Sequence, residues 1–191
     1  MSKPKFSITQ IVMVGLMAAL VFATSNLRIT IPLPVDKAAI HLGNMCCVLA
    51  GLLLGPIGGL ASGIGSFFFD LFNPLYASEA FITLFNKFFI GFVAGLIAHW
   101  RGRTGSNVGR NIVAGVAGSM TYVALYMLKT WVYGSYVFSL EADSAMMLYF
   151  LPKLLTSVVN GVVAVAVAVP LAAVLLKALD KAGISLYPRS A

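Results

Sequence analysis

The sequence predicts an all-α integral membrane protein, a bundle of six transmembrane helices with both termini in the cytoplasm. The first reason is composition: 60% of the 191 residues are hydrophobic and only 10% are charged, whereas a water-soluble domain is about half apolar and about a quarter charged. The second is pattern, because the apolar residues form separate segments, most of them near the roughly 20 residues that cross a bilayer. The third is charge placement. The formal charge of +7 lies in short tails and loops, as in membrane topology control and not as on a nucleic-acid-binding surface.

Six helices are expected, within one transmembrane domain over residues 1–191. They span residues 7–25, 41–55, 57–72, 81–99, 110–133 and 150–177. The first resembles the hydrophobic region of a signal peptide, but it is long for one and no small-residue cleavage site leads into a soluble domain, so we interpret it as a retained helix. The second and third are short and joined by the turn Gly55-Pro56. We expect them to be tilted, partly re-entrant or shielded by neighbouring helices.

The orientation follows from the lysines and arginines, which are enriched in cytoplasmic loops. With both termini inside, the outer loops contain only Arg28 and Lys37. The inner side then holds Lys3, Lys5, Arg101, Arg103, Arg110, Lys177, Lys181 and Arg189, and the outer side also holds Asp36, Glu79, Glu141 and Asp143. Eight basic residues against two predict an even number of crossings with both ends inside.

Small residues at four-residue intervals predict close helix contacts, because they let two backbones approach. One row is Gly51, Gly55, Gly59 and Gly63, and another is Gly91 and Gly95. In the first helix, Gly15, Ala19 and Ala23 form a stripe that either packs inside the fold or docks a partner subunit, and spacing alone favours internal packing. Cys46 and Cys47 are adjacent in an apolar run, so we expect packing residues and not a disulfide or a metal pair.

Four ionisable residues lie within or at the edges of the apolar segments: Asp70, Lys87, Lys129 and Lys153. Charges at membrane depth are costly and usually face a cavity or a partner. The topology places all four near the outer ends of helices three to six, where polar and aromatic residues share their helical faces. We therefore expect a polar, aromatic-lined pocket open to the outside. The expected binding residues are Asn44, Asp70, Asn73, Tyr76, Asn86, Lys87, Tyr126, Lys129, Tyr133, Lys153 and Asn160.

These residues also have structural interpretations. Lysines near helix ends can extend to the interface, and tyrosines populate interfacial belts without binding a ligand. Asp70 could pair with Lys87 or Lys129, and Asn160 could make an ordinary interhelical hydrogen bond. For His41 alone, a structural role is favoured. The pocket hypothesis depends on the cluster and not on any one member.

Common enzyme motifs are missing from the sequence. It has no G-x-x-x-x-G-K-[ST] phosphate-binding loop, so the chain is not expected to hydrolyse ATP itself. It also has no H-E-x-x-H, no G-x-S-x-G and no paired intramembrane aspartates. We expect a protein that is not an enzyme, with no catalytic residue, no metal ligand and no cofactor.

A series of short blocks carries a resemblance that covers nearly the whole chain. The first helix contains Ala19-Leu-Val-Phe-Ala23, an Ala-x-x-x-Ala stripe. The blocks that follow are His41-Leu-Gly-Asn44, Ala50-Gly-Leu-Leu-Leu-Gly-Pro56, Gly63-Ile-Gly-Ser66, Asp70-Leu-Phe-Asn-Pro74, Asn86-Lys87 and Gly91-Phe-Val-Ala-Gly95. In this order and spacing, with six helices and both ends inside, the chain resembles the substrate-binding S components of energy-coupling factor (ECF) vitamin transporters, in particular the riboflavin-transporter-like branch.

The resemblance implies a function and partners. The protein would bind a water-soluble vitamin or cofactor precursor from outside, and the loops at about 26–40 and 134–149 would cover the pocket. The Ala19/Ala23 stripe would dock a transmembrane coupling subunit, which reverses the preference from spacing alone. Two ATPase subunits of the ECF module would supply the energy, as in an ABC importer. The protein would be a multi-pass protein of the cell (plasma) membrane, surrounded by lipid bilayer and without a nucleic-acid partner.

The substrate stays open at this point. Three intramembrane lysines against one aspartate favour an anionic group such as a carboxylate, the outer-loop charges weaken that preference, and the tyrosines suit a flat ring. Riboflavin, a pyridoxine- or pyrimidine-type precursor and pantothenate are the candidates. The alternative is a self-sufficient secondary transporter or small channel, which would support uptake by the purified protein alone. A membrane enzyme acting on lipid or isoprenoid would need acidic clusters, and the outer loops offer only scattered acids.

Overall fold

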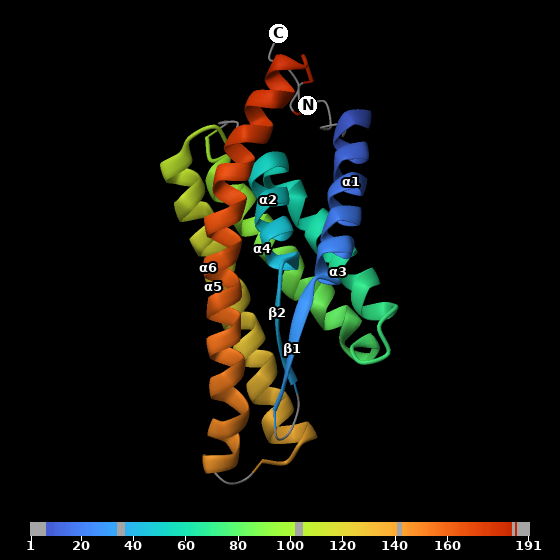
Figure 1. Cartoon of the computed structure of the whole chain (residues 1–191), viewed down its shortest axis with the longest axis vertical. Coiled ribbons are helices and arrows are strands. Elements are labelled where there is room, and N and C mark those ends of the chain that lie inside the picture. The colour runs from blue at the N-terminus through green and yellow to red at the C-terminus, as the bar shows by residue number, and fades with distance from the viewer. Residues whose placement is uncertain (1–6, 34–36, 102–104, 141–142, 185, 187–191) are drawn as a thin grey trace, which may run out of the picture.

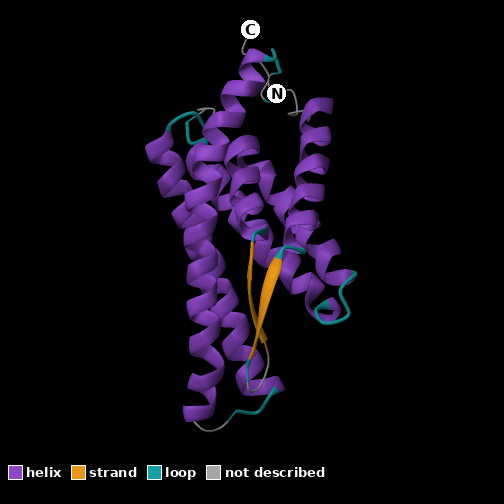
Figure 2. Ribbon diagram, in the orientation of Figure 1, coloured by secondary structure: helices purple, strands orange, loops and turns teal. Residues whose placement is uncertain are grey.

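The computed structural model describes residues 7–33, 37–101, 105–140, 143–184 and 186. Within them the chain is a helical bundle with one two-stranded antiparallel hairpin (Figures 1 and 2). The helices are α1 (Ile8–Ser25), α2 (Gly43–Leu54), α3 (Gly58–Leu71), α4 (Ala80–Ala98), α5 (Val108–Val132) and α6 (Asp143–Lys181). The strands are β1 (Arg28–Pro32) and β2 (Lys37–His41), and short helical turns are η1 (Gly55–Ile57), η2 (Ala77–Glu79) and the π-helical η3 (Tyr133–Val137).

The sequence predicts the bounds of α1 to α5 within two residues, and local capping explains two of the starts. The Ser7 hydroxyl accepts from the Gln10 N–H while the Gln10 side chain accepts from the Ser7 N–H, which is a capping box at α1. The Asn107 side chain caps α5 by accepting from the Arg110 N–H. In contrast, α6 begins seven residues before its expected start, so the predicted loop at 134–149 is partly helical.

The first predicted loop, 26–40, also contains regular structure. β1 pairs with β2, with Ile29 opposite Ile40 and Thr30 opposite Ala39. The β-branched run Ile29-Thr30-Ile31 favours this extended conformation. Figure 1 shows the hairpin extending from the ends of α1 and α2 along the lower halves of α5 and α6.

The two terminal helices share one end of the molecule. α1 begins and α6 ends at the top in Figure 1, where the connection from α4 to α5 also lies. Arg101 and Arg110 flank that connection, and Lys177 and Lys181 lie at the end of α6. The other charges used for the orientation, Lys3, Lys5, Arg103, Arg189, Asp36 and Glu141, lie outside the described residues. The cytoplasmic placement of this end stays a prediction.

Five stretches of the described chain are long and apolar enough to cross a membrane: Ile8–Ser25, Gly43–Leu71, Ala77–Ala98, Val108–Val137 and Asp143–Lys181. The stretch Gly43–Leu71 combines α2, η1 and α3, although the chain reverses direction at η1 (Figure 1). Six crossings therefore stay a prediction. Every residue of α2 except Met45 is buried, which fits a short helix shielded by its neighbours.

The predicted glycine rows bring α2, α3 and α4 into backbone contact. A Cβ on Gly51 would collide with the Gly91 carbonyl, and one on Gly95 would collide with the Gly55 carbonyl. Gly55 also has a φ of 69°, which glycine adopts without steric cost and which permits the reversal into α3. The close contacts predicted from the four-residue spacing are confirmed.

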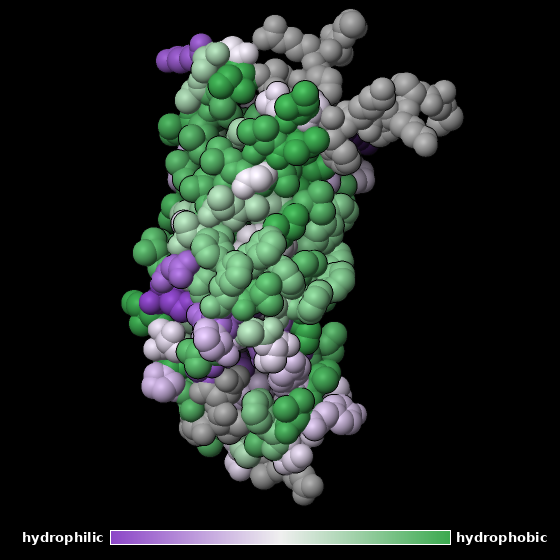
Figure 3. All heavy atoms as spheres, turned by 90° about the vertical axis from the view of Figure 1, so that its right-hand side faces the viewer, coloured by the Kyte–Doolittle hydropathy of each residue, from purple (hydrophilic) through white to green (hydrophobic). Residues whose placement is uncertain are grey.

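The outer surface of the bundle suits lipid. Large apolar side chains are exposed on most helices, among them Ile8, Leu16, Phe81, Trp131 and Leu155. Figure 3 shows hydrophobic residues over most of one face, with hydrophilic residues gathered in its lower half. In water such a surface would promote aggregation, whereas in a bilayer it is the expected one.

Candidate substrate-binding site

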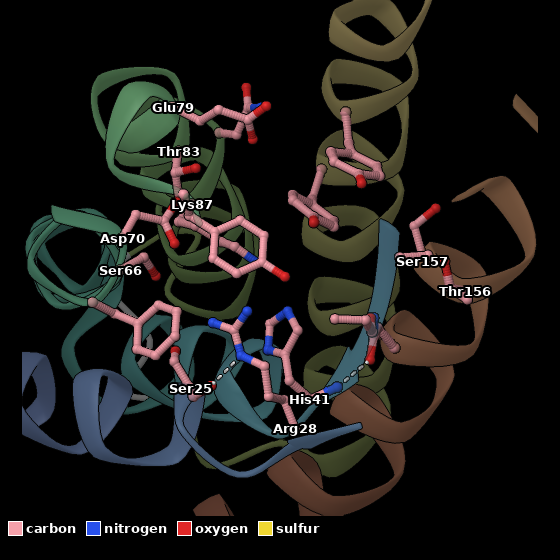
Figure 4. A pocket seen from close by; sticks show the side chains of 18 of the residues that line it. Ser25, Arg28, His41, Ser66, Asp70, Glu79, Thr83, Lys87, Thr156 and Ser157 are labelled. Carbon is pink, nitrogen blue, oxygen red and sulfur yellow. Dashed lines mark hydrogen bonds between the residues drawn. The ribbon is translucent and has the colours of Figure 1, made fainter. Parts of the chain in front are cut away.

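A polar pocket lies where the hairpin, the end of α3, the start of α4, the C-terminal half of α5 and the middle of α6 meet (Figure 4). Its lining combines four cationic side chains, two carboxylates, three tyrosines and several hydroxyls and amides. It consists of Ser25, Arg28, Lys37, Ala38, Ala39, His41, Ser66, Phe69, Asp70, Tyr76, Glu79, Thr83, Asn86, Lys87, Tyr122, Tyr126, Lys129, Thr156, Ser157 and Asn160. Seven of the eleven expected binding residues are in this lining: Asp70, Tyr76, Asn86, Lys87, Tyr126, Lys129 and Asn160.

The pocket is narrow. Its cavity measures about 100 Å³, which is room for several water molecules. Sites for small organic ligands usually measure about 300–1,000 Å³. A molecule of that size therefore requires a shift of the hairpin or of lining side chains when it binds.

Lys87 of α4 lines the pocket. Its side chain is buried, with 6% of its surface exposed. Its Nζ donates to Asn44 Oδ1 on α2 and lies 4.2 Å from the centre of the Tyr122 ring. An ammonium group has three N–H donors, so Asn44 and the ring leave hydrogen-bonding capacity directed at the cavity.

Arg28 enters the pocket from β1. Its guanidinium carbon lies 4.1 Å from the centre of the Phe69 ring and 4.5 Å from that of Tyr76, and its Nε donates to the Ser25 carbonyl at 3.2 Å. Two aromatic rings thus hold the planar group through cation–π contacts. Its terminal nitrogens point toward His41 and the centre of the pocket (Figure 4).

The Lys129 ammonium of α5 forms an ion pair with the Glu79 carboxylate at the start of α4. The sequence left open whether Asp70 pairs with Lys129. In the structure Lys129 pairs with Glu79 instead. Asp70 lies on the other side of Thr83, near Lys87 (Figure 4). On the same face of α5, the rings of Tyr122 and Tyr126 stack at 5.6 Å with an interplanar angle of 14°.

Asn160 of α6 binds the hairpin. Its Oδ1 accepts the His41 N–H at 3.0 Å, and its Nδ2 donates to the Ala39 carbonyl at 2.8 Å. Both halves of the amide are thereby used on the edge of β2. Asn160 therefore holds the hairpin beside the pocket, and its side chain bonds to a strand instead of to another helix.

His41 is held neutral. Burial lowers its pKa well below the ordinary value of 6.5, and the positive charges of Lys87 and Arg28 lower it further. Its Nδ1 is buried and has no hydrogen-bond partner among the described residues. A neutral ring avoids adding a third positive charge to this part of the pocket.

The other four expected binding residues lie outside the lining. Asn44 is not part of the lining, but its Oδ1 accepts a hydrogen bond from the lining residue Lys87. Asn73 accepts from the Leu75 N–H in the turn after α3. The Tyr133 ring lies 5.0 Å from Lys129 Nζ. Lys153 is buried with 3% of its surface exposed, and its Nζ donates to the Tyr149 hydroxyl at 3.1 Å.

Sequence reasoning did not include several lining residues among the expected binding residues, most notably Arg28, Lys37 and Glu79. All three were assigned to outer loops and used to orient the chain and to weigh the charge of the substrate. The signal that could have included Arg28 and Lys37 is the extended run Ile29-Thr30-Ile31 between them. A hairpin there folds the loop back onto the helix ends.

The small-residue stripe of α1 faces outward. Gly15, Ala19 and Ala23 are all exposed, and a Cβ on Gly15 would meet nothing within 4 Å. α1 instead packs on α3 through its other side, where Gly65 abuts the Ala18 carbonyl. Among the described residues, no helix of this chain covers the stripe, which contradicts the internal packing favoured by spacing alone.

A lipid-compatible helical bundle with a polar, partly enclosed pocket is the arrangement expected of a membrane-embedded binding protein. The chain belongs to the family of ECF-type riboflavin transporter S components, whose family model matches residues 5–177. It is therefore a multi-pass membrane protein of vitamin uptake, in a family of transporter components and not of enzymes. The chain is also 30% identical over 109 residues to a protein of Pyrococcus woesei described as an uncharacterized protein in a gap 3' region. That alignment covers 56% of this chain and 70% of the relative.

Proposed function

We propose that this protein is the substrate-capturing subunit of an ECF-type ABC importer in the plasma membrane. It takes a water-soluble vitamin or cofactor precursor from outside and holds it for ATP-driven uptake. Riboflavin, a pyridoxine- or pyrimidine-type precursor and pantothenate are the candidate substrates. The observation that carries the proposal is the polar pocket of the site, which brings Lys87, Tyr122 and Asn160 together under the hairpin in a chain of this family.

The binding step follows from the pocket chemistry. Stacked Tyr122 and Tyr126 offer a flat apolar surface for a ring. Lys87 and the amide of Asn86 supply donors that orient polar substituents. The hairpin covers the pocket and is held by Asn160, so binding and release require this cover to shift.

The partners follow from the family and from α1. A transmembrane coupling subunit would dock on Gly15, Ala19 and Ala23, because small exposed residues let a second helix approach closely. Two ATPase subunits would supply the energy, which fits a chain without a phosphate-binding loop.

Uptake into proteoliposomes tests the proposal. The protein is reconstituted alone and together with an ECF module, with ATP enclosed with the ATPase subunits, and uptake of labelled riboflavin, pyridoxine, thiamine-type pyrimidine and pantothenate is measured. The proposal expects uptake of one compound that requires both the module and ATP. Uptake by the protein alone would instead support the secondary transporter or channel.

A further inference from the structure

Among the residues that the structure describes, the carboxylates of the pocket lining do not balance its positive charge. Its lining contains four cationic side chains and two carboxylates, an excess of two positive charges when His41 is neutral. Glu79 is paired with Lys129. Among the described residues, this leaves Arg28, Lys37 and Lys87 facing Asp70, with no ion pair closer than 4 Å between them.

Two of these cations are built into the fold. Lys87 is more than nine-tenths buried and is fixed by Asn44 and the Tyr122 ring. Arg28 is fixed between Phe69 and Tyr76, so its orientation is set before any ligand arrives. Burying a charge without a counter-charge is costly. One buried cation and one partly buried cation, fixed at a cavity with Asp70 as the nearest free carboxylate, are useful when a ligand supplies the missing negative charge.

The geometry suits an oxyanion. Arg28 and Lys87 come from opposite walls, β1 and α4, and their nitrogens point into the same central space (Figure 4). The edge of a guanidinium group binds a carboxylate or phosphate through two parallel hydrogen bonds, and an ammonium adds a third from another direction. The stacked pair Tyr122 and Tyr126 lies next to Lys87, where an organic ring would extend from the anionic group.

We propose that the natural substrate carries a carboxylate or phosphate group, which Arg28 and Lys87 bind together. This inference rests on the proposed function and narrows it from water-soluble vitamins in general to anionic ones. Charge-assisted hydrogen bonds contribute about 1.5–3 kcal/mol. An anionic ligand should therefore bind at least about 10-fold more tightly than the same molecule without the charge.

Matched pairs of ligands test this with the purified full-length protein, after removal of any bound small molecule. The pairs are riboflavin 5′-phosphate and riboflavin, pyridoxine 5′-phosphate and pyridoxine, and pantothenate and panthenol. Calorimetry gives the dissociation constant of each compound at two salt concentrations. We expect one pair to bind, with the anionic member at least about 10-fold tighter and more sensitive to salt. The pair that binds also distinguishes a phosphate from a carboxylate ligand.

Variants connect the preference to the two residues. Lys87→Gln and Arg28→Gln should each remove most of the preference for the anionic member and change the affinity for the neutral member much less. Lys177→Gln, at the far end of α6, removes the same charge outside the pocket and should change neither. If Lys87→Gln does not fold, Arg28→Lys keeps the charge but loses the two-pronged contact, and it should still reduce the preference.

The outcomes separate the two claims. Equal or tighter binding of the neutral member of the pair that binds would overturn the anionic substrate and leave the vitamin-binding function intact. A preference that survives in Arg28→Gln and Lys87→Gln would overturn the assigned residues. If none of the six compounds binds, the inference of an anionic substrate fails, and the uptake experiment with the ECF module decides the proposed function separately.

Discussion

The side-chain amide of Asn160 on α6 binds the backbone of His41 at the end of β2. Asn160 Oδ1 accepts the His41 N–H at 3.0 Å, and its Nδ2 reaches back to the Ala39 carbonyl. Asn160 is buried, so the two bonds are shielded from water. The covering hairpin is thus attached to the longest helix of the bundle at the edge of the pocket.

Asn160→Leu should loosen this attachment. It keeps the approximate volume but leaves a backbone donor and acceptor of β2 without partners, which costs about 1–3 kcal/mol. We expect amide hydrogen exchange in residues 37–41 to rise about 10-fold, together with weaker ligand binding. Thr121→Val, which removes a hydroxyl bonded only within α5, is the control. Unchanged exchange in Asn160→Leu would mean that the hairpin is held by other contacts.

The docking stripe predicts a separation of binding from transport. Replacing both Ala19 and Ala23 with leucine should spare ligand affinity, because both side chains are exposed and lie outside the pocket. The same change should abolish ATP-driven uptake, because a partner helix could no longer approach. Ala124→Leu, an exposed position on α5, should leave both intact. Normal uptake by the Ala19/Ala23 variant would remove the docking role.

Close packing of η1 against α4 predicts that one added methyl group will lower the stability of the protein. Gly95→Ala places a Cβ against the backbone carbonyl of Gly55. A backbone atom cannot move aside as the end of a flexible side chain can. We expect a loss of stability of about 1–3 kcal/mol or more, measured as a lower midpoint of thermal unfolding in detergent. Gly15→Ala meets nothing within 4 Å and should not lower the midpoint of the isolated protein. Equal midpoints for both variants would contradict this packing.

The sequence predicts the helices better than the site, for physical reasons. Long apolar segments and glycine spacing report directly on membrane helices and their contacts, so α1 to α5 lie within two residues of expectation. The hairpin has only five residues in each strand and forms because α6 and the helix ends hold it. The run Ile29-Thr30-Ile31 indicates an extended segment, but the position of Arg28 in the pocket depends on the tertiary structure that holds this segment. The start of α6 was predicted seven residues too late, although the apolar run already begins at Ala145.

The neutral state of His41 predicts a pH dependence of stability. Its pKa is lowered in the folded protein by burial, by Lys87 and by Arg28. As the pH falls below 6.5, the unfolded chain takes up a proton that the folded protein does not, so folding stability falls, at up to about 1.4 kcal/mol per pH unit. His41→Asn should show a smaller loss of thermal midpoint between pH 7.5 and pH 5. The same loss in both proteins would assign the pH dependence to other groups.

The ion pair of Lys129 with Glu79 predicts a modest coupling. Both side chains are partly exposed, at 11% and 24%, so the pair should stabilise the fold by no more than about 1 kcal/mol. In a double-mutant cycle with Lys129→Gln and Glu79→Gln, the double variant should lose less stability than the two single losses combined. Strict additivity would indicate that the two groups do not interact in the membrane-embedded protein.

The central claim is that this pocket holds a vitamin or cofactor precursor, and the most direct test is to identify what the protein carries. The protein is purified in mild detergent and denatured, and the released small molecules are identified and quantified by mass spectrometry. Lys87→Gln, purified in parallel, controls for molecules bound elsewhere. We expect one vitamin or precursor at close to one per protein molecule, and much less from the variant. A protein that releases no such compound, and takes up no vitamin with an ECF module and ATP, would contradict the account.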